Sequence, residues 1–242
     1  AAKLFTRSNN LREDKFGMAV DISGDTIVVG AEEYTDPSSG IEYSGAAFVF
    51  TRDVPGDLYS QWTQVGCGEF PSRCEKGMLL APLERHEARF GRSVAIDGVV
   101  IVVGQNSAGV FSTSFPTYSS PNPSRGAANV FHRVEEGALA SAWRMVHELV
   151  PDERVSDGLG FGTSVAIKGD IVVVGAPYAS ATLQKEYLPG DETPSLHQNG
   201  VVSVFRRVGT HRFGARYDVV NDVVGESDDE HLGHSVAVSG GN

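Results

Sequence analysis

The sequence predicts an all-β protein, a β-propeller built from four-stranded antiparallel blades. A Phe-Gly anchor opens similar stretches at Phe16, Phe90 and Phe161, and returns as Leu-Gly at Leu232. A second stretch recurs in step with the anchor, as GAAFVFTR, GAANVFHR and GVVSVFRR. No segment has a convincing helical period. Four predicted strands in a repeat of about 70 residues are typical of propeller blades.

The first strand of each unit follows the anchor. In the first unit, residues 18–22 alternate in polarity, so one face of this strand is expected to be buried. The anchor glycines fit a close approach of backbones. Small residues recur along the strand and suit the crowded innermost position of a blade: Ala19, Ser93, Ala95, Ser164 and Ala166.

The second strand is a run of β-branched residues that ends in Gly, a composition typical of a strand buried on both faces. An X-Gly pair, such as Ser23-Gly24, precedes it and predicts a hairpin, because Gly accepts positive φ. The residues that define the repeat motif are Phe16, Gly17, Gly30, Phe90, Gly91, Gly104, Phe161, Gly162, Gly175, Ala176 and Pro177.

The Ala-Val-Phe stretch is the predicted third strand, and a segment that begins with Trp is the predicted fourth. The fourth strand starts at Trp62 in the first unit and at Trp143 in the second. In the third unit RYDVV, residues 216–220, takes its place. The outer strand is expected to cover the blade edge.

Partial units flank the three complete ones. AAKLFTR at the start resembles the third strand, and LGHSVAVSGG from Leu232 repeats the first strand. We therefore expect residues 1–242 to form a single propeller segment, an arc of a larger propeller. Its open blade faces would strongly favour packing against something else.

The motif FG-x-S-V-A-I-x-G-D-x-I-V-V-G-A-P, followed by G-A-A-x-V-F and a Trp, resembles the FG-GAP repeat. The match is best in FGTSVAIKGDIVVVGAP, residues 161–177, and the resemblance covers essentially the whole chain. FG-GAP repeats build the propellers of integrin α-subunit heads and of many surface proteins, usually with seven blades. The resemblance therefore implies a location outside the cell or at its surface, and a role in adhesion.

Many integrin-type blades hold calcium in a loop between the first two strands. Such a cation needs about 6–8 oxygen ligands, so the loop must be long enough to surround it. Here the predicted loop has two residues in every copy. Asp25 and Asp170 follow the Gly and are interpreted as turn-stabilising, and Val99 takes the equivalent place in the second unit. The chain is similar to the calcium-free variety, and we expect no cofactor.

Other candidate chemistry is weak. His231 and His234 stand near Asp228, Asp229 and Glu230, a set that could attract a divalent cation. The histidines align with unrelated residues in the other copies, so a solvated loop is the favoured interpretation. No spacing marks a catalytic triad or a carboxylate pair, and we expect the segment not to be an enzyme.

Composition limits the classes of partner that the chain is expected to bind. The formal net charge of −11 disfavours nucleic acid, and no apolar run is long enough for a membrane helix. Cys67 and Cys74 stand close together in CGEFPSRC. Either they form a local disulfide, which would fit a secreted or surface protein, or they are two free thiols on a loop.

Inserts of unequal length follow the second strands, at residues 32–44, 105–125 and 176–199. All three leave their blades at the same point, so they should emerge on one face, and variable loops on a regular scaffold often carry binding. Their aromatic residues either contact a partner or cover their own blades. The candidate contact residues are Tyr34, Tyr43, Phe111, Phe115, Tyr118, Tyr178 and Tyr187.

Together these observations predict a non-catalytic surface platform for protein, or glycan, partners, or for further blades, with contacts made mainly by the loops between strands. The alternative is an accessory propeller of an enzyme whose catalytic part lies outside this chain.

Overall fold

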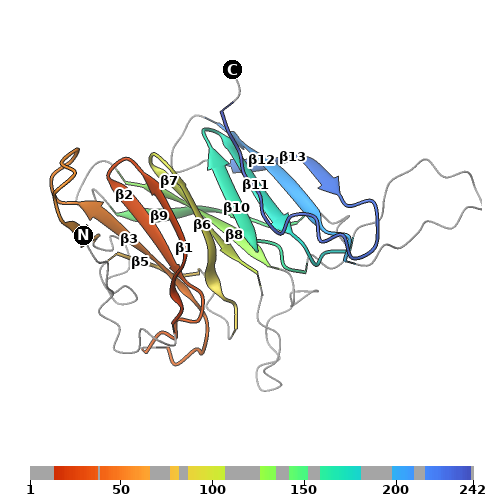
Figure 1. The fold of residues 1–242 in the computed structure, drawn as a ribbon, viewed down its shortest axis with the longest axis horizontal. Coiled ribbons are helices and arrows are strands. Elements are labelled where there is room, and N and C mark those ends of the chain that lie inside the picture. Colours follow the sequence, from red (N-terminus) through yellow and green to blue (C-terminus); the bar gives the residue numbers. More distant parts are fainter. Residues whose placement is uncertain are drawn as a thin grey trace, which may run out of the picture.

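The computed structural model describes residues 14–37, 39–65, 77–81, 87–106, 126–134, 142–151, 159–180, 198–209 and 216–240. Within these residues every regular element is a β-strand, and the strands form three antiparallel sheets, as expected for propeller blades (Figure 1). No helix in this part of the chain has the length and apolar character needed to cross a bilayer.

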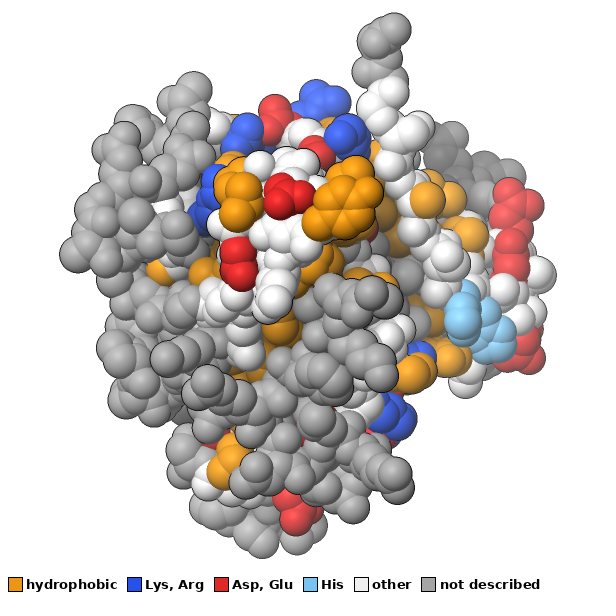
Figure 2. All heavy atoms as spheres, turned by 60° about the vertical axis from the view of Figure 1, so that its left-hand side comes forward, with side chains coloured by type: hydrophobic (Ala, Val, Ile, Leu, Met, Phe, Trp, Pro, Cys, Tyr) orange, Lys and Arg blue, Asp and Glu red, His pale blue; other side chains and the backbone are white. Residues whose placement is uncertain are grey.

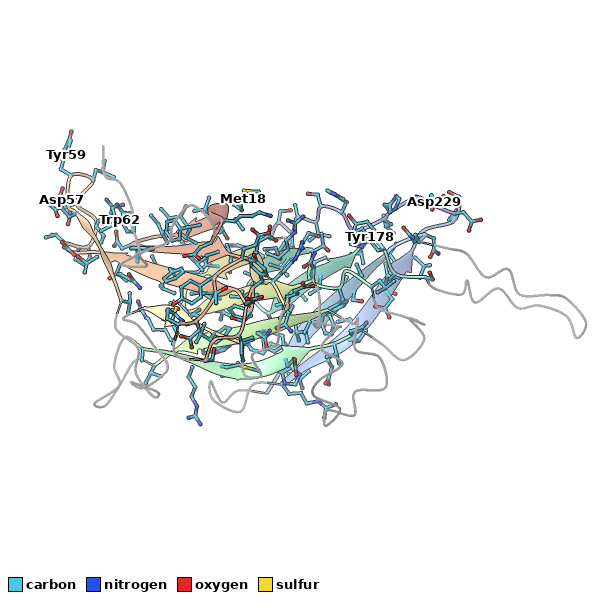
Figure 3. The ribbon with its side chains drawn as sticks, turned by 90° about the horizontal axis from the view of Figure 1, so that it is seen from below. Met18, Asp57, Tyr59, Trp62, Tyr178 and Asp229 are labelled. Carbon is cyan, nitrogen blue, oxygen red and sulfur yellow. The ribbon has the colours of Figure 1, made fainter. Side chains whose placement is uncertain are left out.

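Each sheet is one predicted repeat unit. Blade 1 consists of β1 (Phe16–Ser23), β2 (Thr26–Ala31), β3 (Ala46–Arg52) and β4 (Trp62–Gln64), with a short β5 (Met78–Leu79). Blade 2 consists of β6 (Phe90–Asp97), β7 (Val100–Gln105), β8 (Ala127–Arg133) and β9 (Trp143–Leu149). Blade 3 consists of β10 (Ser164–Lys168), β11 (Ile171–Ala176), β12 (Val201–Val208) and β13 (Arg216–Val224). The strands pair in chain order, and the inner strands β1, β6 and β10 lie side by side (Figures 1 and 3).

The hairpin between the first two strands has the predicted length, but its position shifts by one residue. Ser23 pairs with Thr26, so the two loop residues are Gly24 and Asp25. Asp25 therefore lies in the turn and does not follow it, and the same holds for Asp170. Gly24 has φ +56, and a positive φ at the first loop residue is what the type II′ hairpin turn requires.

The core lies mainly between the blades. One cluster combines Val28 and Val49 of blade 1 with Phe90, Ile101 and Phe131 of blade 2. A second cluster joins blades 2 and 3, and a third lies within blade 1. The second strands are almost wholly buried, as their β-branched composition predicts.

The motif glycines form the junctions between blades. Gly91 lies in a cradle of blade 1 backbone, where a Cβ would come 2.2 Å from the carbonyl oxygen of Ala46. Conversely, a Cβ on Gly30 would come 2.0 Å from the carbonyl oxygen of Gly91. Gly162 and Gly233 occupy equivalent cradles in blades 2 and 3. The Phe-Gly and Val-Val-Gly glycines are therefore two sides of one contact, through which each blade docks on its predecessor.

In β1 the alternation of apolar residues has an unexpected outcome. The apolar side chains of Met18, Val20 and Ile22 are 64, 63 and 54% exposed, whereas Ala19 and Asp21 between them are partly buried. The prediction that the apolar face of this strand is buried is therefore wrong here. At the equivalent positions of β6 and β10 the preceding blade covers the side chains, and in the described part of the chain no blade precedes β1.

The outer strand of blade 1 is split where the other two blades have a bulge. In blade 2 the register shifts between Val130 and Phe131, and in blade 3 it shifts at the equivalent place. In blade 1 the Val49 N–H donates to Gly77, and the Val49 carbonyl accepts from Val65. The outer strand of blade 1 is thus interrupted opposite Val49, at the position where a bulge accommodates an extra residue in the other two blades.

Candidate functional site

Register divides each blade into two ends. Ser23 pairs with Thr26 at the end that carries the short turns, and Phe16 pairs with Ala31 at the opposite end, where the long inserts begin. We call these the turn end and the loop end. β3 runs from the loop end to the turn end, so the segment between β3 and β4 belongs to the turn end.

Asp25 is bound into blade 1 at the turn end. Its Oδ1 accepts a hydrogen bond from Nε of Arg52 at 2.7 Å, and both carboxylate oxygens lie 3.1 Å from the backbone N of Gly56. The Arg52 N–H also donates to the backbone oxygen of Asp25. The Arg52 guanidinium lies 4.5 Å from the ring centroid of Trp62, a cation–π contact. The interpretation of Asp25 as a turn-stabilising residue fits these contacts.

Blade 3 repeats this ion pair between Asp170 and Arg207, and blade 2 keeps only its backbone half. There the Arg133 N–H donates to the carbonyl oxygen of Val99, because valine offers no carboxylate. A two-residue turn that supplies one carboxylate, already bound by arginine, does not fit the calcium site implied by the resemblance. The arginine partner was missed in the sequence, although an Arg ends all three third-strand stretches.

Replacing Asp25 by Ala is expected to lower the free energy of unfolding by about 1–2 kcal/mol, because a partly exposed ion pair and hydrogen bonds from Gly56 are lost together. Urea titration measures this loss. A metal chelator should leave the melting temperature of the wild-type protein unchanged. A chelator-induced fall in melting temperature that disappears in Asp25→Ala would instead assign the carboxylate to a cation.

Polar contacts between blades follow the inner strands. Asp21 Oδ2 accepts from the Ile96 N–H at 2.8 Å, and Asp97 Oδ2 accepts from the Gly169 N–H at 2.7 Å. The Gly169 N–H, and then the ammonium of Lys168, hold the pKa of Asp97 below its ordinary value. Asp97 is therefore ionised at neutral pH and links blade 2 to blade 3.

Glu32 lies at the loop end of the junction between blades 1 and 2. Its side chain is only 1% exposed and lies between Lys15 Nζ, at 3.2 Å, and Arg92 Nη1, at 3.1 Å from its nearer oxygen. Arg92 belongs to blade 2, so this buried carboxylate bridges two blades. The motif pattern gave no signal for it, because the equivalent residues of the other units are Asn106 and Pro177.

The inserts at the loop end begin alike. The Gly45 N–H donates to the Tyr34 carbonyl at 2.9 Å, and the Gly200 N–H donates to the Ala179 carbonyl at 3.1 Å. Each bond closes the insert where it leaves its blade. The last residues of the insert then pair with the approach to the next blade, as in the bond from the Phe90 N–H to the Ser44 carbonyl. The loops of blades 1 and 3 therefore emerge at equivalent places.

The candidate aromatic residues differ in exposure. Tyr34 is 2% exposed and packs edge-to-face on Phe48, so it covers its own blade, and a contact role is wrong for it. Tyr43 and Tyr178 are 42 and 40% exposed, so both can reach a partner. Tyr178 is labelled in Figure 3. Phe111, Phe115, Tyr118 and Tyr187 lie outside the described residues, as do Cys67 and Cys74.

The acidic segment near the end of the chain makes local contacts. Glu230 Oε2 accepts from the N–H groups of Glu226 and Ser227. His231 has φ +54, contacts the Tyr178 ring and lies 3.3 Å from Gln198 Oε1, whereas His234 is exposed. No three His, Cys, Asp or Glu side chains of the described ranges are grouped so as to hold a metal ion. Figure 2 shows histidines beside acidic side chains on this surface.

The position before each Phe-Gly anchor is more restricted than its varied residues indicate. Lys15, Arg89, Gly160 and His231 all have positive φ, and each carbonyl accepts from the N–H three residues later. His231 is therefore part of the repeat's backbone geometry. Its position is set by the turn before the anchor.

Three blades that dock through glycine cradles, with short turns at one end and long inserts at the other, define a propeller-type repeat protein. The family model for the FG-GAP repeat matches residues 2–50 and 143–187. The chain carries FG-GAP repeats, and blade 2, whose anchor lies outside both matched ranges, has the same sheet order. No curated protein matches the chain.

Proposed function

We propose that this chain is a non-catalytic propeller platform, on a cell surface or outside the cell, that binds protein partners through its loop end. The observation that carries the proposal is the common exit of the inserts, closed by equivalent bonds from Gly45 and Gly200. A rigid scaffold with unequal loops at one end is a frequent basis for recognition. FG-GAP repeats favour an interaction role for the module.

Tyr43 and Tyr178 are the contact residues favoured by exposure. Tyrosine is enriched at binding hot spots, because a large ring and a hydroxyl lose little conformational entropy on binding. The Tyr43 backbone is held by bonds with Thr35 and Arg89, and the Tyr178 ring lies edge-to-face on His231. The Tyr43 backbone and the Tyr178 ring are thus held in place, while both residues stay partly exposed.

The test uses the labelled chain on a panel of extracellular protein domains and on a glycan array. Partners of the wild type should lose about tenfold or more in affinity with the double variant Tyr43→Ser/Tyr178→Ser. The matched control is Tyr59→Ser, which removes a tyrosine that is 95% exposed at the turn end (Figure 3). It should bind like the wild type.

Three results would count against the proposal. Partners that are lost with Tyr59→Ser and kept by the double variant would move the binding site to the turn end. Binding to glycans alone would replace the protein partner by a carbohydrate. Turnover of a substrate by the chain itself would contradict the non-catalytic role.

A further inference from the structure

A buried histidine lies in the junction between blades 2 and 3. His132 of β8 is only 1% exposed, and its Nε2 lies 3.3 Å from Oη of Tyr217 on β13. Tyr217 is 4% exposed and belongs to the core cluster that joins the two blades, together with Val130 and Phe205. The two polar rings therefore meet inside the apolar core of the junction, across 85 positions of the chain.

The state of the tyrosine shows that water is largely excluded from this contact. Desolvation raises the pKa of Tyr217 to about 12, with Arg207 opposing this rise and Asp170 adding to it. The hydroxyl therefore stays protonated throughout the range in which proteins usually work. Imidazole is the side chain whose ordinary pKa falls between about 5 and 8, so a titration of the ring pair near neutral pH is that of His132.

A positive charge on His132 would meet no spare carboxylate among the described residues of the junction. His132 pairs across the sheet with Arg144, and Tyr217 pairs with Arg207, so both cations share a face with the ring pair. The carboxylates of the junction are already engaged, Asp170 by Arg207 and Asp97 by Lys168. The charged and titratable groups that line the junction are Asp97, Arg144 and His147 of blade 2, and Lys168, Asp170, Arg207 and Tyr217 of blade 3.

His147 offers a matched histidine in the same junction. It lies on β9, and its ring centroid is 6.1 Å from that of Tyr217. Unlike His132 it is only partly buried, so its ring keeps access to water. A charge on His147 therefore costs less desolvation than a charge on His132.

The junction between blades 1 and 2 has no histidine at the equivalent place. In the motif stretch of the third strand, Thr51 of blade 1 takes the position of His132. A threonine hydroxyl does not titrate in the range where histidine does. The two internal junctions share their glycine cradles and apolar clusters but differ in this ionisable ring.

We infer that the junction between blades 2 and 3 is an acid-sensitive joint: mild acid protonates His132, and the charged ring weakens the docking of blade 3 on blade 2. A charge in a contact without water or a counter-ion is costly, whereas the unfolded chain accepts the proton freely. The stability contributed by the neutral ring is therefore complete above the ordinary histidine pKa and is lost as the pH falls below it. The inference does not rest on the loop-end partner, because His132 pairs with Val100 beside the turn end.

Urea titration of the 242-residue chain at about pH 7.5 and about pH 5 tests the inference. If the folded state excludes the proton, the unfolding equilibrium constant should rise up to about 30-fold from the higher to the lower pH through this one group. His132→Gln keeps a polar side chain beside Tyr217 but cannot be protonated, so its rise should be smaller than that of the wild type by about tenfold or more. Asp97 stays ionised over this range, because its pKa is already below the ordinary value.

His147→Gln is the matched control, and it should keep the pH dependence of the wild type. The double variant Tyr43→Ser/Tyr178→Ser should keep it as well, which separates this inference from the proposed function. Equal pH dependence of the wild type and His132→Gln would overturn the inference, as would its disappearance in His147→Gln.

Two measurements on the wild type test the joint without a substitution. Hydrogen exchange, corrected for the intrinsic effect of pH, should show that acid lowers the protection of β10 and β11 before that of β1 and β2, because a blade depends on its neighbours for stability. Equal loss in both blades would contradict the inference. In an NMR titration the His132 ring should stay neutral until the protection of blade 3 falls, and a ring that is protonated while blade 3 stays fully protected would overturn it.

Discussion

Gly91→Ala should destabilise the protein by about 3 kcal/mol, whereas Gly17→Ala should cost only about 1–2 kcal/mol. Both glycines follow a motif phenylalanine, and both have nearly the same positive φ, so an alanine pays the same backbone strain at either site. Only Gly91 lies in a cradle, where the added methyl would meet the carbonyl oxygen of Ala46 at 2.2 Å. The difference between the two losses of stability therefore measures the steric cost of placing a methyl group in the junction between blades 1 and 2.

Urea titration measures both losses. In a repeat protein each unit is stabilised largely by its neighbours, so a weakened junction should also reduce cooperativity between blades 1 and 2. We therefore expect a shallower or two-step transition for Gly91→Ala and an ordinary one for Gly17→Ala. Equal losses for the two variants would show that the cradle relaxes without cost.

Phe90→Ala is expected to cost about 3–5 kcal/mol, the range for emptying a fully buried aromatic site. Phe90 is completely buried between blades 1 and 2, with its ring centroid 6.1 Å from that of Phe131. The cavity would open in the core that joins two blades. Backbone on both sides is fixed by the cradle at Gly91, so little collapse can fill it.

Phe16→Ala is the matched control for Phe90→Ala. Phe16 occupies the same motif position and packs edge-to-face on Phe48, at 5.6 Å between centroids, but it is only partly buried. Its loss should be about half that of Phe90→Ala, measured as the change in urea midpoint at constant slope. A larger loss for Phe16→Ala would contradict the assignment of the main core to the space between blades.

The strands and turns could be predicted because they depend on local pattern. The β-branched runs that end in Gly30 and Gly104 became buried second strands, and the Gly at each turn took the positive φ that a tight hairpin needs. Repetition multiplied this signal, because one motif read in several copies also gives the spacing of the units. The order of strands within each sheet followed from these local features.

Features that depend on contacts across blades could not be read from the pattern. Glu32 is bound by Lys15 of its own blade and by Arg92 of the next, residues whose proximity depends on how two sheets dock. Tyr34 was a candidate contact residue because it lies in a variable insert, and only its packing on Phe48 shows that the ring covers its own blade. The partner of Asp25 is likewise 27 positions along the chain.

The sequence by itself determined that the protein is a row of similar four-stranded units and that its Gly-Asp turns are short. Local backbone preference and side-chain alternation are enough for that. Only the tertiary structure decided which copies of the motif are covered. Val94 and Val20 occupy the same position of the motif. Val94 is buried and Val20 is exposed, because burial depends on whether a neighbouring blade lies against the strand.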